Sequence, residues 1–284
     1  MAFVSERFAA WVWYRGDAFA GFQRQPQERT VQEVLEAACL AAGAGEVTVM
    51  PAGRTDRGVS ARMQVVSFRL RGSVDGAAIR SRVEAELKAL QGAIGFAEDW
   101  VRPAPSFHAQ WSATSREYRY RIALGAAAPP DAWAPFVWRP GKDARIGTGS
   151  LDPARLEEVL ALAEGTHDFH AFHERSSVRK PRRLERAALV ELGEGVFELV
   201  LRGDSFGRHQ VRYLVGAVCL VAAGRLSVEA FSRALFETEP IAGLRAPPEP
   251  LVLWEVHYPP GIDPFGAAER RRARGLPATP PFRY

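Results

Sequence analysis

Two runs of strand-forming residues with a polar loop between them constrain this chain more than any other feature. Residues 46–50 and 63–70 are rich in β-branched side chains, which is typical of strands. The loop at 52–61 reads Ala-Gly-Arg-Thr-Asp-Arg-Gly-Val-Ser-Ala. Gly53 and Gly58 permit a tight turn or a close approach to a ligand, because glycine has no Cβ. The pattern predicts a strand-to-strand loop that carries one carboxylate between two arginines.

That carboxylate is Asp56, with Arg54 and Arg57 on either side. Nearby cations favour the charged form of a carboxylate. An ionised aspartate in basic surroundings suits a nucleophile or a base that faces a polyanion. The alternative is an ordinary turn with exposed ion pairs, which are common and contribute little stability.

The composition is that of a globular protein whose positive charge comes almost entirely from arginine. The chain has 284 residues, enough for one large domain or two ordinary ones, with 47% hydrophobic and 25% charged residues. Its net charge is +4 and its pI about 9.3, and lysine occurs only at positions 88, 142 and 180. Arginine grips phosphate with two parallel bonds and stacks on bases, which favours a nucleic acid as ligand. A GC-rich genome would explain the arginine content equally well.

The cysteines and the apolar runs predict a cytoplasmic protein without a membrane segment. Cys39 and Cys219 lie far apart in apolar runs, which indicates buried thiols in a reducing compartment. Glu6 and Arg7 precede a short apolar run, so the layout of a signal peptide is missing. The longest apolar run, 213–224, is too short to cross a bilayer.

The first part of the chain has the predicted order β-α-β-β-α-β. Residues 8–14 form an aromatic strand, and Thr-Val-Gln-Glu at 30–33 has the form of a capping box that opens a helix. After the two strands around the loop come a helix over about 76–90 and a strand at 94–101. This is the order of a ferredoxin-like unit, a split βαβ sheet with helices on one face.

A second α+β series follows. Its predicted elements are strand 115–124, helix 152–164, strands 186–192 and 196–202, a helix over about 208–223, a shorter helix from 227, and strand 251–258. We therefore predict an α+β fold of two ferredoxin-like halves, with mostly antiparallel sheets joined around a central cleft. The halves are expected at 1–112 and 113–260, and 261–284 form a tail that is a candidate for disorder.

Residues 115–121 alternate arginine with tyrosine on a predicted strand. Alternate side chains share a face, so Tyr118 and Tyr120 point one way, and Arg119 and Arg121 the other. A tyrosine on a sheet can stack on a nucleobase. The alternative is that both rings belong to the core.

Segment 204–212 is predicted to open the long helix, whose free N–H groups could meet an anion. Arg208 and Arg212 are four residues apart and would share a helix face. There they could be solvated, could cover the core, or could reach an ionised aspartate or a phosphate.

The densest basic runs are 178–183 and 270–272. Such runs are usually solvated surface, and a disordered tail would explain the second. The first lies between predicted elements and could contact RNA phosphates.

Three histidines at a spacing of three residues are candidates for a metal site. On a helix, His167, His170 and His173 would spread over an arc of about 120°, which is wide for one ion. We therefore predict no metal site. No phosphate-loop or dinucleotide-binding pattern occurs in the chain.

Several motifs occur in an order that resembles the TruA family of tRNA pseudouridine synthases, over nearly the whole chain to about Tyr258. They are Tyr14-Arg15-Gly16 with Phe19, Gly21-Phe22-Gln23 with Gln25, Arg29-Thr30-Val31-Gln32, the loop 52–61, Phe107-His108-Ala109, residues 116–120 and 206–216, and Ala246-Pro247-Pro248 within 243–253. The Gly-Arg-Thr-Asp-x-Gly-Val core of the loop is the most specific of these motifs.

The resemblance implies that uridine is isomerised to pseudouridine at positions 38, 39 and 40 in the anticodon stem-loop of tRNA. The glycosidic bond is cut, the uracil turns, and C5 rejoins C1′, so no cofactor or metal is required. Asp56 would be the catalytic residue in the central cleft, either attacking C1′ or removing a ribose proton. Both roles need an ionised carboxylate.

The resemblance also implies roles for four other side chains. Tyr118 would stack on the target uracil and help to remove the C5 proton, and Arg212 would pair with Asp56. Arg54 would displace the nucleotide from the stem, because an enzyme that acts on a stacked base must flip it out. Leu251 falls where the family has an apolar residue of the uracil pocket.

The implied assembly is a homodimer that binds tRNA across both subunits. The expected contacts to RNA phosphates are Arg57, Arg179, Lys180, Arg182 and Arg208. Departures from the family pattern are Arg15 for aspartate, Phe22 for tryptophan, Ser60 for histidine and Pro250-Leu251-Val252-Leu253 for Gly-Leu-Tyr-Leu. They affect the pocket and leave the three reactive side chains in place.

Two other functions compete with this one. A non-catalytic RNA-binding module or RNA chaperone could use the same basic cleft. A metal-dependent hydrolase could be built on His167, His170 and His173.

Overall fold

The fold is mixed α+β with a large, mostly antiparallel sheet, as a computed structural model shows. This agrees with the α+β class and the mostly antiparallel pairing that the sequence predicts. The chain divides into two compact units: unit 1 comprises Met1–Thr114 and Leu253–Tyr284, and unit 2 comprises Ser115–Val252. The structure describes residues 5–72, 76–125, 129, 131, 133–147, 151–174, 179–237, 244–278 and 282.

Unit 1 contains the predicted order β-α-β-β-α-β. Its elements are β1 (Ser5–Tyr14), the 3₁₀ helix η1 (Gly16–Ala18), α1 (Val31–Ala41), β2 (Glu46–Pro51), β3 (Ser60–Arg71), α2 (Gly76–Lys88), β4 (Ile94–Phe96), most of β9 (Leu251–His257) and α6 (Ala267–Arg274). The strands follow the order β4-β1-β3-β9, and β2 also pairs with β3. β1 pairs antiparallel with β3 and β4, and so does β2 with β3.

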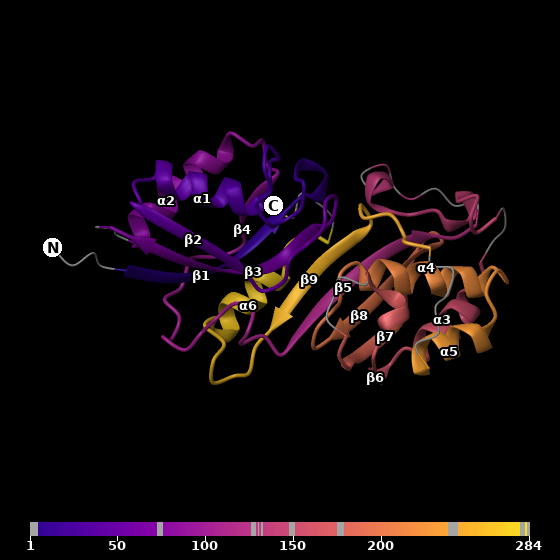
Figure 1. Ribbon diagram of the computed structural model, residues 1–284. Coiled ribbons are helices and arrows are strands. Elements are labelled where there is room, and N and C mark those ends of the chain that lie inside the picture. Colours follow the sequence, from indigo (N-terminus) through magenta and orange to yellow (C-terminus); the bar gives the residue numbers. More distant parts are fainter. Residues whose placement is uncertain are drawn as a thin grey trace. The chain divides into compact units, whose positions relative to one another are not determined.

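The predicted capping residue opens α1. The Thr30 hydroxyl accepts a hydrogen bond from the Glu33 amide at 3.3 Å, which satisfies one of the free N–H groups of the first turn. The buried face of α1 includes Val31, Leu35 and Cys39. α1 packs against α2 and β2, and Figure 1 shows both helices on the same side of the strands.

The C-terminal segment is a packed part of unit 1 and not a disordered tail. Trp11 of β1 is fully buried and stacks on Phe265 with ring centroids 3.7 Å apart. The buried carboxylate of Glu255 accepts from Arg270 at 2.8 Å and from Arg274 at 2.9 Å. Arg270 and Arg274, which the sequence alone suggests are solvated, therefore pair with the buried Glu255 of β9.

Because the C-terminal segment packs in unit 1, the boundaries between the two units differ from the predicted ones. The expected halves were 1–112 and 113–260, whereas unit 1 ends at Thr114 and resumes at Leu253. Arg62, only 2% exposed, helps to fix the returning segment by donating to the carbonyl oxygen of Leu276 at 2.6 Å. A residue far along the sequence thus satisfies a buried cation of β3.

Unit 2 is built on the strand order β5-β8-β7-β6, with antiparallel pairing throughout. Its elements are β5 (Ser115–Ala123), η2 (Ala134–Phe136), η3 (Pro140–Lys142), α3 (Pro153–Ala161), β6 (Gly165–His167), η4 (His170–Phe172), β7 (Arg182–Gly193), β8 (Val196–Gly203), α4 (Gln210–Ala222), α5 (Val228–Phe236) and the start of β9. α3 packs against α4 and β7. The short strand β6 was not predicted.

Both cysteines are buried free thiols, as predicted. Burial raises the pKa of Cys39 to about 12, with a smaller contribution from Glu36. Burial also raises the pKa of the Cys219 thiol. Among the described residues, no helix combines the length and apolar character needed to span a bilayer.

Candidate active site

Asp56 lies in a tight turn between β2 and β3. The Val59 amide donates to the Asp56 carbonyl at 3.1 Å, and Gly58 has a φ of 82°. Glycine adopts a positive φ at the third residue of such a turn without steric strain. Asp56 is half-buried, so the turn fixes its backbone without enclosing the whole residue.

Two glycines outside this loop let another loop pack directly against it. A Cβ on Gly16 would lie 2.2 Å from the carbonyl oxygen of Gly58. A Cβ on Gly21, whose φ is 97°, would lie 2.9 Å from the carbonyl oxygen of Thr55. The Phe22 amide donates to that same Thr55 oxygen at 3.0 Å. The two glycine motifs near the N-terminus therefore support the aspartate loop from outside.

Buried polar side chains hold the loop from beneath. The hydroxyl groups of Tyr14 and Thr55 are hydrogen-bonded at 2.8 Å. The Gln64 amide group donates to the Gly53 carbonyl at 2.6 Å and accepts from the Gly53 amide at 3.3 Å. Sequence reasoning missed these roles, although a glutamine inside an apolar strand is the kind of signal that could have indicated one.

Two departures from the family pattern fit into the structure. Ser60 stands where the family usually has histidine. Its hydroxyl accepts a buried hydrogen bond from the Gly16 amide at 3.0 Å. Arg15 pairs with Asp17 at 2.5 Å near the surface. Neither residue displaces the aspartate loop.

The arginines beside Asp56 are both exposed. Arg57 forms an ion pair with Glu28 at 2.6 Å, with 65% of the arginine side chain and 43% of the glutamate exposed. Exposed pairs of this kind contribute little stability. Arg54 and Arg57 are therefore placed where solvent or a polyanion can reach them.

Tyr118 lies on β5 and is nearly buried. The ring of Phe206 meets it edge-on with centroids 5.1 Å apart, an arrangement that aromatic pairs prefer. Tyr120 is fully buried, and its hydroxyl donates to the carbonyl oxygen of Pro247 at 2.9 Å. Tyr120 therefore belongs to the core.

The arginines of β5 share the face that the alternation predicts. Glu198 of β8 accepts from Arg119 at 3.0 Å and from Arg121 at 3.1 Å. Arg121 is only 2% exposed, and its guanidinium lies over the ring of Trp133. These two arginines serve the fold of unit 2.

Arg212 is buried in the first turn of α4. Its Nε donates to the Ala246 carbonyl at 2.7 Å, and the Ala246 amide returns a bond to the Arg212 carbonyl at 3.1 Å. A Cβ on Gly216 would lie 1.8 Å from the carbonyl oxygen of Leu244. Only glycine at position 216 lets this segment run so close to α4, and that contact orients Arg212.

The expected relation between Arg208 and Arg212 is wrong. α4 begins at Gln210, and His209 before it has a φ of 60°, so Arg208 is not on the helix. The Arg208 guanidinium pairs instead with Glu174 at 3.4 Å. The positive φ at His209 turns the chain, which removes the four-residue spacing from a common face.

The predicted site residues fall into two groups. Asp56 and Arg54 lie on one loop of unit 1. Tyr118, Arg212 and Leu251 belong to unit 2, where Leu251 is the buried first residue of β9.

The basic run of unit 2 contains one buried member. Arg179 and Lys180 are exposed, and Arg179 pairs with Asp168. Arg182 is 4% exposed, and its Nη1 donates to the Lys180 carbonyl at 3.2 Å and lies 3.4 Å from Nε2 of His173. The sequence predicts that Arg182 contacts an RNA phosphate, and the structure corrects this prediction. The Arg182 guanidinium is buried and hydrogen-bonded within unit 2.

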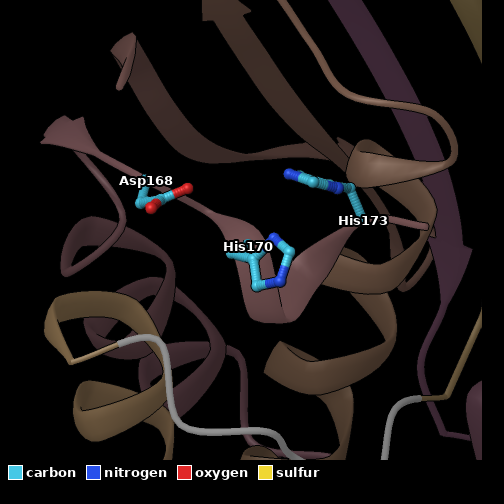
Figure 2. Close-up of side chains that lie close together, drawn as sticks. All are labelled: Asp168, His170 and His173. Carbon is cyan, nitrogen blue, oxygen red and sulfur yellow. The ribbon is translucent and has the colours of Figure 1, made fainter. Parts of the chain in front are cut away.

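The three histidines do not lie on one helix. His167 ends β6, His170 begins η4, and His173 follows η4. Phe169 between them has a φ of 54°, which excludes a continuous helix. The argument from a helical arc therefore does not apply here, and His170 and His173 instead lie beside Asp168 (Figure 2). Burial lowers the pKa of His173.

Comparisons with known proteins identify the class to which this fold and these motifs belong. A family model described as tRNA pseudouridine synthase matches residues 159–259. The chain is 35% identical over 263 residues to tRNA pseudouridine synthase A of Acidiphilium cryptum, covering 91% of this chain and 98% of the relative. It is 34% identical over 256 residues to the protein of the same name in Chloroflexus aurantiacus, covering 88% and 87%.

These matches define a pseudouridine synthase, which is an isomerase. More narrowly, the chain belongs to the tRNA pseudouridine synthase A family. Among solved structures, it also matches a chain of a Cbf5-Nop10-Gar1 complex with 14% identity and a TM-score of 0.30, over 75% of this chain and 44% of that one. A likeness at that level adds nothing to the assignment.

Proposed function

We propose that this chain isomerises uridine to pseudouridine at positions 38, 39 and 40 in the anticodon stem-loop of tRNA, with Asp56 as the catalytic residue. Membership of the tRNA pseudouridine synthase A family supports tRNA as the substrate. The observation that carries the role of Asp56 is its half-buried position on a loop that glycine contacts and buried hydrogen bonds fix. Such preorganisation is what positioning catalysis requires.

The proposed reaction breaks the bond between N1 of uracil and C1′ of ribose. The uracil turns in the site, C5 bonds to C1′, and C5 then loses its proton while N1 gains one. Asp56 either attacks C1′ or removes a ribose proton at the first stage, and both routes use its carboxylate. No atom enters or leaves the nucleotide, which agrees with an isomerase.

The remaining roles follow the family pattern. We assign stacking on the uracil and help with removal of the C5 proton to Tyr118. Arg212 pairs with Asp56, and the two hydrogen bonds between Arg212 and Ala246 support its fixed orientation. Arg54 helps to flip the nucleotide out of the stem, and Leu251 contributes an apolar wall to the uracil pocket.

Exposed basic residues would contact the RNA backbone, namely Arg57, Arg179, Lys180 and Arg208. The protein would act in the cytoplasm as a homodimer with tRNA across both subunits. Light scattering of the purified protein tests the assembly, because a particle of 31.3 kDa would be a monomer and would remove the dimer.

The decisive experiment uses unmodified tRNA transcripts with uridine at position 38, 39 or 40. Carbodiimide labelling followed by primer extension maps pseudouridine after treatment with wild type, Asp56→Asn or Asp17→Asn. Asp17 is a matched control, because it is an exposed carboxylate of the same unit that pairs with Arg15. We expect stops at those positions with wild type and Asp17→Asn only.

Turnover near the wild-type level in Asp56→Asn would overturn the role of Asp56. Tight tRNA binding without any stops would instead favour a non-catalytic RNA-binding protein. Pseudouridine at other uridines would keep the activity and replace the assigned positions.

A further inference from the structure

A compact group of metal-binding side chains lies outside the proposed active site. Asp168, His170 and His173 occupy the short segment that follows β6 and includes η4. Each offers one ligand atom, and these atoms all lie within 4.8 Å of one another. Figure 2 shows the Asp168 carboxylate and the His173 ring directed towards each other, with the His170 ring beside them.

Two atoms of this group are buried without a hydrogen-bond partner. They are Oδ1 of Asp168 and Nδ1 of His170, a finding that holds for the part of the chain that the structure describes. Buried polar atoms in folded proteins nearly always have a partner. Two such atoms side by side, both able to donate an electron pair, indicate a ligand that accepts electron pairs.

The third member presents a lone pair to the same place. Nδ1 of His173 lies 2.9 Å from the carbonyl oxygen of Glu174, which can only accept, so Nδ1 carries the proton. Nε2 is then the unprotonated nitrogen. A histidine that binds a metal through one nitrogen commonly donates from the other to a carbonyl group, which fixes its tautomer and its orientation.

We propose that Asp168 Oδ1, His170 Nδ1 and His173 Nε2 bind one divalent transition-metal ion, with Zn²⁺ as the preferred ion. Two imidazole nitrogens and one carboxylate oxygen are typical zinc ligands, at bond lengths of about 2.0–2.2 Å. Side-chain rotation must bring the three atoms closer than their present separation, and His170 is only half-buried. Water would complete the coordination.

The positive charges of two nearby arginines would lower the affinity of the site for a cation. Arg179 pairs with the Asp168 carboxylate, and Nη1 of Arg182 lies 3.4 Å from Nε2 of His173. The Arg182 guanidinium must move away from His173 when the ion binds. We therefore infer a site of moderate affinity, in which loss of a neighbouring positive charge strengthens binding.

The ion would act as a structural clamp and takes no part in the proposed isomerisation. The His173 ring packs on Gly207, where a Cβ would lie 2.8 Å from it. Phe206, the residue before Gly207, contacts the ring of Tyr118. An ion at His173 would thus stiffen the 206–207 segment, which packs against both His173 and Tyr118.

The test measures metal binding directly on the full chain. The protein is stripped with a chelator, dialysed, and titrated with Zn²⁺ by calorimetry, and Co²⁺ serves as a probe with visible absorption bands. We expect one Zn²⁺ per chain, a rise in Tm, and Co²⁺ bands typical of nitrogen and oxygen ligands. His170→Gln and His173→Gln should each weaken binding at least about tenfold.

Two further variants sharpen the result. His167→Gln is the matched control, because the His167 ring contacts the Glu164 carbonyl at 3.0 Å and is not one of the three ligands. It should bind Zn²⁺ like wild type, whereas Arg179→Gln should bind it severalfold more tightly. Wild type without one-to-one binding or Co²⁺ bands, or equal binding by His170→Gln and His173→Gln, would overturn the proposal.

Discussion

Gly16 shows at the scale of one residue how a distant position can control Asp56. Its backbone touches Gly58 closely enough that a methyl group would lie 2.2 Å from the Gly58 carbonyl oxygen. No rotation of a side chain can relieve that overlap, because the opposing atom belongs to the backbone. The missing side chain of Gly16 is therefore part of what positions the aspartate loop.

Gly16→Ala should lower both stability and turnover. The added methyl group forces the two loops apart, which costs about 1–3 kcal/mol as an overpacking change and displaces Asp56. Urea denaturation and the primer-extension assay measure the two effects. Gly261→Ala is the control, because its Cβ would meet no atom within 4 Å. Equal behaviour of the two variants would contradict the role given to Gly16.

Substitutions at Tyr118 separate its two proposed roles. Tyr118→Phe keeps the ring that packs against Phe206 but removes the hydroxyl, whereas Tyr118→Leu removes both. If the phenol assists removal of the C5 proton, Tyr118→Phe should bind tRNA normally and lose about 100-fold in single-turnover rate. Tyr118→Leu should also bind tRNA more weakly. Full turnover by Tyr118→Phe would leave stacking as the only role.

At the scale of elements, the C-terminal segment and β1 depend on each other. Trp11 is fully buried, and the ring that stacks on it, Phe265, comes from residues that follow β9. Without that segment, β1 would lose the ring that stacks on its buried indole. The segment therefore completes the core of unit 1.

Phe265→Ala should destabilise the protein by about 3–5 kcal/mol, because it opens a cavity beside Trp11. Phe236→Ala is the matched control, since Phe236 is 62% exposed and should change stability by less than about 0.5 kcal/mol. Urea denaturation at neutral pH measures both variants. Similar small losses would mean that the C-terminal segment does not stabilise unit 1.

The link between β9 and α6 should depend on pH. Burial raises the pKa of Glu255, but hydrogen bonds from Arg274 and Arg270 and the nearby charge of His257 outweigh it, so its pKa lies below the ordinary 4.5. A carboxyl whose pKa is lowered by folding stabilises the protein fully above its unfolded pKa. That stability is lost as the pH falls through the lowered value.

Glu255→Gln should accordingly be less stable than wild type at neutral pH. The difference should persist down to about the ordinary pKa of 4.5 and shrink below it, because protonated Glu255 resembles the glutamine. Urea denaturation across this pH range measures the difference. A gap that stayed constant into acid would show that the ionised form of Glu255 is not what its arginine partners stabilise.

At the scale of the whole molecule, the excess of arginine serves two purposes. Arg62, Arg121 and Arg182 are nearly buried and hold the fold through carbonyl groups or carboxylates. Other basic residues, among them Lys180, are exposed and available to phosphate. A net charge of +4 therefore says less about RNA binding than the distribution of exposed charges does.

Binding of tRNA should release counterions from the phosphates. The logarithm of the binding constant should therefore fall linearly with the logarithm of the salt concentration. Lys180→Gln should reduce the slope by about one if Lys180 contacts a phosphate. Lys142→Gln is the control, as an exposed lysine of unit 2 outside the proposed contacts. Filter binding at several salt concentrations measures the slopes. Equal slopes for both variants would remove Lys180 from the interface.

Local sequence patterns predicted several elements of this protein and its family. The capping box at Thr30 places the start of α1, and the alternation on β5 puts Arg119 and Arg121 on one face, as Glu198 confirms. The Gly-Arg-Thr-Asp-x-Gly-Val core, together with the other motifs, led to the family that the relatives then showed. Such features depend on residues close together in the chain, so they can be read without a fold.

Other features were outside the reach of local patterns. Arg182 and the arginines of α6 read as solvated charge, because nothing near them in sequence reveals the acids and carbonyl groups that receive them. Likewise the helical spacing of the histidines gave no hint of Asp168, since one positive φ at Phe169 reorganised the segment. The roles assigned to Asp56, Tyr118 and Arg212 stay predictions.

The sequence by itself determined the α+β class, the membership of a synthase family and the loop that carries Asp56. Only the tertiary structure decided that the C-terminal segment completes unit 1, that Arg182 is buried, and that Asp168 lies beside His170 and His173. The physical reason is the range of the interactions. Capping, turns and alternation act between neighbours in the chain, whereas burial of a charge depends on which distant groups the fold brings to it.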